Sequence, residues 1–179
     1  NLMAAVAAVH ITTNKPLDKI CEAVEGFGGV SGRMETISSN PLVIVDFAHT
    51  PDGMDEVLQS FNEKDIICVF GAGGDRDKAK RPLMGSVAAS YSKHIIVTCD
   101  NPRFEDPDMI IEDILKGIKN HTSVQIELNR KEAIKKAIEM ADSNSVVLIL
   151  GKGDETYQEV QGKKYPFDDR DVVKNVIAQ

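Results

Sequence analysis

The chain has 179 residues, of which 42% are hydrophobic and 27% charged, a composition typical of a soluble globular protein. Its formal net charge of −7 excludes a general nucleic-acid binder, because such a protein needs a basic face for the phosphates. No apolar run approaches the roughly 20 residues of a membrane span, and the three cysteines show no zinc-binding spacing. We therefore expect a cytoplasmic protein with neither a membrane partner nor a metal site, in which Cys68 and Cys99 are buried.

The first 30 residues have a helical pattern of their own. Asn1–Val9 is helix-forming from its first residue, and Pro16–Val24 begins with a proline, which suits a first helical turn. The glycine-rich residues 26–29 then mark a boundary. We expect residues 1–30 to be the tail of a preceding domain in a longer chain and residues 31–179 to form the next domain.

From Arg33 onward, strand and helix patterns alternate. Short runs rich in β-branched residues predict strands at Met34–Ser38, Leu42–Phe47, Ile66–Phe70, His94–Thr98, Val124–Leu128 and Val146–Leu150. Segments with helical periodicity predict helices at Asp52–Phe61, Arg81–Tyr91, Pro107–Lys119, Arg130–Ala141 and Asp169–Ala178. This alternation predicts a Rossmann-like α/β fold, with a mostly parallel sheet of about six strands flanked by helices on both faces.

Glycine-rich and charged loops follow four of the predicted strands, at residues 46–52, 71–82, 100–107 and 151–158. Because the carboxyl ends of parallel strands meet at one edge of a sheet, ligands bind there, and we expect the functional site there. Two common nucleotide motifs are missing. Arg76 stands where a dinucleotide fingerprint needs its third glycine, and no GxxxxGK[ST] segment occurs. An NAD-dependent enzyme and a self-sufficient nucleotide hydrolase are therefore disfavoured.

Seven motifs, in order along the chain, resemble the C-terminal domain of the MurE type of Mur ligase. They are Gly32–Glu35, Asp46–Asp52, Gly73–Lys78, Lys80–Gly85, Asp100–Pro107, Gly151–Gln158 and Phe167–Arg170. The resemblance runs from Gly32 to the end of the chain, and Asn1–Val9 resembles the last helix of the family's central ATPase domain. It implies part of an ATP-dependent ligase that extends the UDP-N-acetylmuramoyl dipeptide in bacterial peptidoglycan synthesis. ATP and Mg²⁺ would bind mainly outside this chain, which we expect to be monomeric and, alone, inactive.

The resemblance also assigns roles to individual residues. The residues that it implies for the amino-acid substrate are Arg76, Asp100, Asn101, Pro102, Arg103, Gly151 and Glu155. It implies that Arg33, Asp46 and His49 lie near the nucleotide, and it gives no catalytic residue or metal ligand in this chain. Simpler roles stay open: Arg33 pairing with Glu35, His49 as a turn residue, and Asp100 pairing with Arg103. We expect Asp77, Lys78 and Arg81 to be loop and interface charges.

The segment Asp100–Arg103 predicts which amino acid the ligase adds. An arginine offers a planar fork of donors that suits a carboxylate, and meso-diaminopimelate has a second carboxylate whereas L-lysine has none. The sequence therefore favours meso-diaminopimelate. An L-lysine-adding ligase, a folylpolyglutamate-type ligase and a non-catalytic amino-acid-binding module remain as alternatives. One departure from the family pattern is Asp154, which stands where the family usually has histidine.

Overall fold

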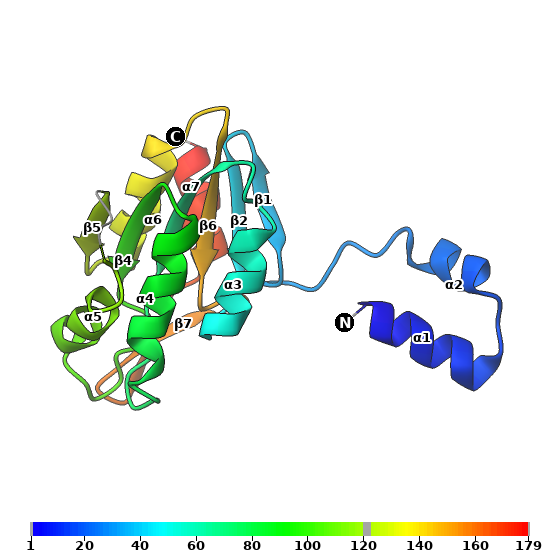
Figure 1. Cartoon of the computed structure of the whole chain (residues 1–179), viewed down its shortest axis with the longest axis horizontal. Helices are drawn as coiled ribbons and strands as arrows, with labels where there is room; N and C mark the ends of the chain where they lie inside the picture. The colour runs from blue at the N-terminus through cyan, green and yellow to red at the C-terminus, as the bar shows by residue number, and fades with distance from the viewer. Residues whose placement is uncertain (1, 120–122, 179) are drawn as a thin grey trace.

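A six-stranded sheet forms the centre of the computed structural model, which describes residues 2–119 and 123–178 (Figure 1). Its strands are β1 (Glu35–Ser39), β2 (Leu42–Asp46), β3 (Asp65–Phe70), β4 (His94–Thr98), β5 (Val124–Glu127) and β6 (Ser145–Leu150). They lie in the order β1-β2-β6-β3-β4-β5, and only β1 runs antiparallel to its neighbour. The predicted α/β fold is confirmed.

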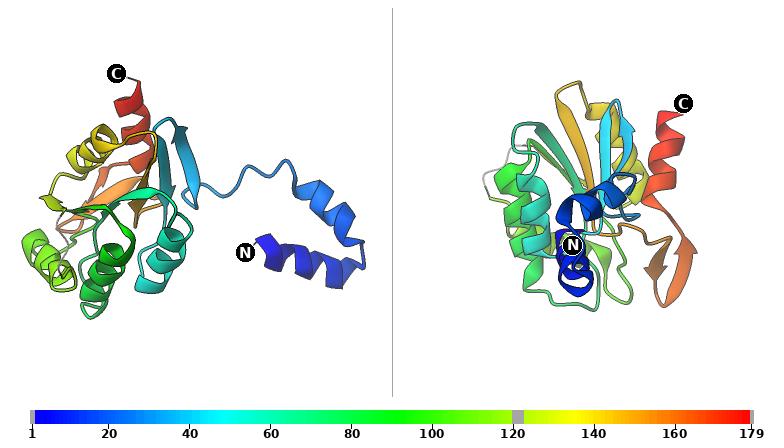
Figure 2. Two further views of the ribbon diagram at one scale, coloured as in Figure 1. Left: turned by 45° about the horizontal axis from the view of Figure 1, so that its top comes forward. Right: turned by 90° about the vertical axis from the view of Figure 1, so that its right-hand side faces the viewer.

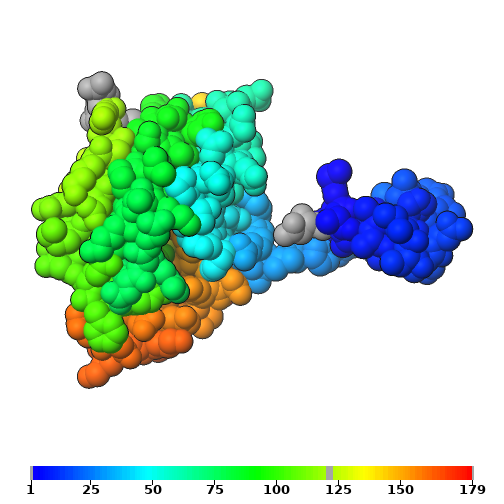
Figure 3. Space-filling model, turned by 60° about the horizontal axis from the view of Figure 1, so that its bottom comes forward, coloured from blue at the N-terminus to red at the C-terminus, as the bar shows by residue number. Residues whose placement is uncertain are grey.

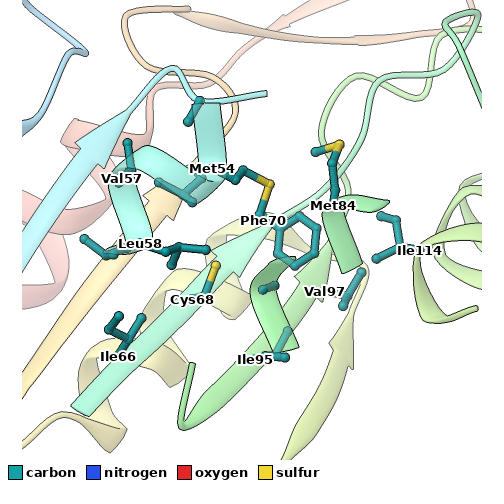
Figure 4. Close-up of a cluster of buried hydrophobic side chains, with 14 of the residues drawn as sticks. Met54, Val57, Leu58, Ile66, Cys68, Phe70, Met84, Ile95, Val97 and Ile114 are labelled. Carbon is teal, nitrogen blue, oxygen red and sulfur yellow. The ribbon is translucent and has the colours of Figure 1, made fainter. Parts of the chain in front are cut away.

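Helices cover both faces of the sheet (Figures 1 and 2). One face carries α3 (Pro51–Gln59), α4 (Lys80–Tyr91) and α5 (Pro107–Leu115), and the other carries α6 (Arg130–Met140) and α7 (Asp169–Ile177). Alternate side chains of each strand enter opposite cores, so that on β6 Leu148 packs with the first group of helices and Ile149 with the second. Figure 4 shows the first core, in which Phe70 and Cys68 of β3 lie among the helix side chains.

Local sequence signals explain where these helices begin and end. Thr50 and Asp106 cap α3 and α5 by accepting backbone N–H bonds, and each is followed by a proline in the first turn. The predicted helix Pro107–Lys119 was too long, because α5 ends at Leu115. Gly117 lies in the turn that follows, and its lack of a side chain allows a close approach to α4, because a side chain there would meet the carbonyl oxygen of Pro82 at 1.7 Å.

A two-stranded hairpin, β7 (Tyr157–Val160) and β8 (Lys163–Pro166), follows the main sheet. These two strands were not predicted from the sequence. Gln161 and Gly162 form the turn with φ values of 50° and 72°, which is the left-handed geometry of a tight two-residue hairpin. The hairpin also pairs with the loop after β4 through a bridge between Val160 and Arg103, so it belongs to the functional edge of the sheet.

Two N-terminal helices, α1 (Leu2–Thr13) and α2 (Leu17–Val24), pack on each other and lie apart from the sheet (Figures 1 and 2). The sequence predicted a helix over Asn1–Val9, but α1 continues to Thr13. Asn1 itself lies outside the described residues. Helix α1 buries none of its described residues, and Met3 and Ile11 are among its exposed apolar side chains. Among residues 2–119 and 123–178, no helix has the length and apolar character needed to cross a bilayer.

Candidate functional site

A cavity of about 360 Å³ lies at the carboxyl ends of β2, β3, β4 and β6. Figure 3 brings this end of the molecule toward the viewer, and the orange segment that contains the hairpin lies along its lower edge. Of the ten residues singled out from the sequence, seven line the cavity: His49, Arg76, Asp100, Asn101, Arg103, Gly151 and Glu155. Because these residues come from four different loops, the fold gathers them into one site. Pro102, Arg33 and Asp46 lie outside the lining.

The loop after β4 presents Arg103 from an unusual backbone position. Arg103 has a φ of 52°, and its Nη1 donates to the carbonyl oxygen of Gly74 at 2.6 Å. Its Nε lies 3.4 Å from the Glu159 carboxylate of the hairpin. The alternative in which Asp100 pairs with Arg103 is therefore wrong. Pro102 packs against the loop that follows β3. Gly74 of that loop lies so close to it that a side chain on Gly74 would meet the Pro102 carbonyl oxygen at 1.9 Å.

The acidic side of the cavity joins the loops after β4 and β6. Asn101 is buried, and its Nδ2 donates to the Glu155 carboxylate at 2.8 Å. Gly151 has a φ of 117°, and a side chain there would lie 2.8 Å from an oxygen of Asp100, so only glycine lets the two loops approach. Two acids, Asp100 and Glu155, thus line the same cavity. Lys152 was not among the residues singled out from the sequence, although its place between two glycines directly after a buried strand indicates that it lies at this edge of the sheet.

Arg81, in the first turn of α4, lines the cavity and is the centre of an ion-pair cluster rather than the loop or interface charge that the sequence suggested. Only 1% of it is exposed, and its guanidinium contacts Glu105 at 2.8 Å and Asp113 at 3.1 Å. Glu105 also accepts hydrogen bonds from Lys78 and from the backbone N–H of Asp75. These donors, Arg81 foremost, lower the pKa of Glu105 to about 2. The cluster ties the loop after β3 to the loop after β4.

The three residues expected near a nucleotide gather around Phe47 on one side of the cavity. The Arg33 guanidinium lies 4.1 Å from the centre of the Phe47 ring, and the His49 ring packs edge-on at 4.5 Å. The Asp46 carboxylate accepts the backbone N–H groups of Met34 and Ala48, each at 2.7 Å. Phe47 lines the cavity and was missed by the sequence analysis.

The proposed pairing of Arg33 with Glu35 is wrong. Glu35 instead accepts the backbone N–H of Gly32 at 2.7 Å and lies 3.8 Å from Arg170. Gly32 is itself packed against the loop after β6, since a side chain there would meet the backbone nitrogen of Asp154 at 2.0 Å. The segment that leads from α2 into β1 therefore touches a loop of the cavity.

A buried ion pair supports the end of β6. Arg130 and Asp169 are both fully buried, and their side chains share two hydrogen bonds of 2.8 and 2.7 Å. Arg130 also donates to the carbonyl oxygen of Leu150 at 3.1 Å, directly before Gly151. The pair joins α6 and α7 to the strand from which the acidic loop leaves.

The cysteines differ from one another in exposure. Cys68 is buried as expected, and burial raises the pKa of its thiol to about 12. Cys99 is only partly buried, contrary to expectation, because β4 ends at Thr98 and Cys99 begins the loop. Within the two described ranges, no three His, Cys, Asp or Glu side chains are placed to hold a metal ion.

A family model described as "Mur ligase, glutamate ligase domain" matches residues 32–153, more than half of the chain. The chain belongs to the Mur ligase family. This Mur ligase chain is 55% identical over 178 residues to the "UDP-N-acetylmuramoyl-L-alanyl-D-glutamate--2,6-diaminopimelate ligase" of Helicobacter hepaticus. The match covers 99% of the chain and 38% of that relative, and the chain spans about two fifths of the length of the curated relatives that it matches.

Solved structures show the same relationship. A UDP-N-acetylmuramoyl-L-alanyl-D-glutamate--2,6-diaminopimelate ligase superposes on this Mur ligase chain with a TM-score of 0.78 and 38% identity, over 98% of this chain and 37% of that one. A Mycobacterium tuberculosis folylpolyglutamate synthase, solved with ADP and AMPPCP, gives a TM-score of 0.64 and 22% identity over 82% of this chain and 35% of that one. At that identity, the likeness is evidence for a shared fold alone.

Proposed function

We propose that this chain is the amino-acid-binding, C-terminal part of an ATP-dependent ligase that adds meso-diaminopimelate to UDP-N-acetylmuramoyl-L-alanyl-D-glutamate. Relatives bearing the name of that ligase match essentially the whole chain, which supports this assignment. We further propose that residues 1–30 are the tail of the central ATP-binding domain and that residues 31–179 form the C-terminal domain. The exposed apolar side chains of α1 support this division, because they suit a surface that packs against more protein.

The observation that carries the proposal is the charge pattern of the cavity. Two acids, Asp100 and Glu155, and two arginines, Arg76 and Arg103, line one space of about 360 Å³. Three further charged residues, Asp77, Lys80 and Arg81, also line it. Diaminopimelate has two ammonium groups and two carboxylates, so each charge finds an opposite partner. We assign the ammonium groups to the two acids, the distal carboxylate to Arg103 and the other carboxylate to Arg76. L-Lysine would offer no carboxylate to the Arg103 guanidinium, which would keep Glu159 as its anionic neighbour, and a site whose polar group finds no partner on the ligand discriminates against that ligand.

The chain's own part in the reaction is positioning. In the chemistry of the family, ATP activates the dipeptide carboxylate as an acyl phosphate, and the amine of the amino acid then displaces phosphate. Holding that amine in place converts a two-body encounter into a reaction within one complex. We propose that Arg33, on the Phe47 ring, and the neighbouring Asp46 and His49 contact the nucleotide when the domains close. The described acids do not form a ligand set that fits Mg²⁺, so no step assigned to this chain depends on it.

The substrate assignment is tested with the full-length ligase, which is assayed with meso-diaminopimelate and with L-lysine. The wild type should use diaminopimelate and discriminate against lysine by up to roughly 10⁴-fold in kcat/KM. Arg103→Ala should lose most diaminopimelate activity while its KM for ATP stays the same. Lys174→Ala, which removes an exposed positive charge from α7, is the control. A wild type that uses lysine equally well, or an unchanged Arg103→Ala variant, would refute the assignment.

The nucleotide assignment has a separate test. Arg33→Ala should raise the KM for ATP by about 10- to 100-fold, because a charge-assisted contact contributes roughly 1.5–3 kcal/mol. The KM for diaminopimelate should not change. Asp46→Ala should act in the same direction, but it also removes the acceptor for two backbone N–H groups, so Arg33→Ala is the cleaner variant. A change in the amino-acid KM alone would contradict the assignment.

A further inference from the structure

A fully buried lysine lies between the loops that follow β4 and β6. The Nζ atom of Lys152 is 3.0 Å from Oδ1 of Asn101 and 3.1 Å from Oε2 of Glu155, and it lies 5.7 Å from the centre of the Tyr157 ring. The residue exposes none of its surface. An ammonium group in such a place is costly unless it is paired and hydrogen-bonded, and here Glu155 supplies the anion.

The backbone fixes where this ammonium lies. Gly151 and Gly153 flank Lys152, and both have left-handed φ values, 117° and 55°. A side chain on Gly153 would meet the carbonyl oxygen of Gly32 at 2.6 Å, and one on Gly151 would meet Asp100 at 2.8 Å. The chain is thus packed closely on both sides of Lys152, whose carbonyl oxygen also accepts the N–H of Glu155 at 3.0 Å. Lys152 has little freedom to move its ammonium elsewhere.

Lys152 sets the orientation of two side chains that line the cavity. Oδ1 of Asn101 accepts from Lys152 and from the backbone N–H of Glu159 at 2.9 Å, so the Asn101 amide must turn its Nδ2 toward Glu155. Among residues 2–119 and 123–178, the hydrogen bonds to the Glu155 carboxylate come from Lys152 and Asn101, and both fall on Oε2. The other oxygen, Oε1, stays available to a ligand in the cavity.

We propose that Lys152 is a positioning residue for the amino-acid substrate. It holds Oε2 of Glu155 and Oδ1 of Asn101, and so it presents Oε1 of Glu155 to a substrate ammonium group without touching the substrate itself. This inference rests on the proposed function, because it concerns the same site. It predicts that Lys152 acts only through its two partners, and that its loss is felt in binding of the amino acid rather than of ATP.

The test is a double-mutant cycle in the full-length ligase, with Lys152→Met, Glu155→Gln and the double variant. Lys152→Met should raise the KM for meso-diaminopimelate about 10-fold or more, the size expected for loss of a hydrogen bond to a charged group. The KM for ATP and the kcat at saturating amino acid should change by less than about 2-fold. In the double variant, the increase in the diaminopimelate KM should be clearly smaller than the product of the two single increases, because Lys152 then has no carboxylate to position and acts through Asn101 alone.

The control is Lys93→Met, which removes another carboxylate-paired lysine at the opposite end of the sheet and should change none of these constants. If Lys152→Met alone does not fold, the double variant remains informative, because it removes both members of the pair and leaves no buried charge unpaired. A diaminopimelate KM that is unchanged in Lys152→Met, or an increase in the double variant equal to the product of the two single increases, would overturn the proposal. If instead Glu155→Gln has no effect while Lys152→Met does, the proposed role of Glu155 in substrate binding fails.

Discussion

Glu105 offers a direct test of how the loops around the cavity are held together. Its carboxylate accepts two bonds from Arg81, at 2.8 and 3.0 Å, one from Lys78 at 3.0 Å and one from the N–H of Asp75 at 2.6 Å. Glu105→Gln keeps the shape of the side chain and removes its charge. The buried Arg81 would then keep only Asp113 as an anionic partner. We expect the folded state to lose stability.

The size of the loss follows from the pKa. The pKa of Glu105 falls from its ordinary 4.5 to about 2 on folding. That difference corresponds to about 3 kcal/mol at neutral pH, and because water reaches part of the cluster, we expect about 2 kcal/mol. Since the folded pKa is the lower one, the contribution is fully present above pH 4.5 and disappears as the pH falls toward 2. It should decrease by about half between pH 5 and pH 3.

The measurement is the free energy of unfolding of the 179-residue chain in urea, followed by circular dichroism between pH 3 and pH 7. The difference between wild type and Glu105→Gln should be largest at pH 7 and shrink in acid. Glu63→Gln, which makes the same chemical change in the exposed turn between α3 and β3, is the control and should show no difference. A difference for Glu105→Gln that does not depend on pH would refute the argument, because it would arise from packing and not from the charge.

Three further outcomes are expected. Asp169→Asn should destabilise the chain by about 3–5 kcal/mol, because it leaves Arg130 buried without its anion; a loss in thermal unfolding no larger than that of a surface variant would contradict this. Iodoacetamide at pH 8 should label the exposed Cys21 in the native chain but not Cys68, because burial raises the pKa of the Cys68 thiol to about 12. Mass spectrometry will distinguish the two sites, and labelling of Cys68 in the native chain would contradict this expectation. The isolated 179-residue chain should unfold cooperatively and catalyse no ligation, and measurable ligation by it would contradict the proposed domain division.

Strands that are buried on both faces could be predicted from the sequence because they are continuous apolar runs. The predicted strand at Val146–Leu150 differs from β6 by one residue, and that at Ile66–Phe70 differs from β3 by one. The hairpin strands β7 and β8 were not predicted, because their residues are polar and partly or fully exposed and show no apolar periodicity. Their evidence in the sequence was the turn pair Gln161-Gly162, which is weaker than an apolar run.

The sequence could predict which loops form the candidate site, but not which side chains pair with each other there. The fold class alone brings Asp100 and Glu155 to the same edge, since both follow parallel strands. It does not say that Arg103 pairs with Glu159 or that Arg81 pairs with Glu105, because these partners lie 56 and 24 residues apart in the chain and meet only through tertiary packing. The sequence places Lys152 at this edge of the sheet, directly after a buried strand, but it does not predict that the side chain is buried, because the neighbouring glycines are common in exposed turns.

The position of β6 has a consequence for how the protein is made. Residues 145–150 bond to β2 on one side and to β3 on the other, although every other strand of the main sheet precedes them in the chain. While a ribosome is still synthesising residues before 145, the hairpin β1–β2 and the piece β3–β4–β5 have no common neighbour, and each exposes an apolar edge. Contacts between residues so far apart in the chain form slowly, and unpaired edges invite association with other chains or capture by chaperones. The loops of the cavity therefore come together late in folding, once β6 has entered the gap between the two pieces.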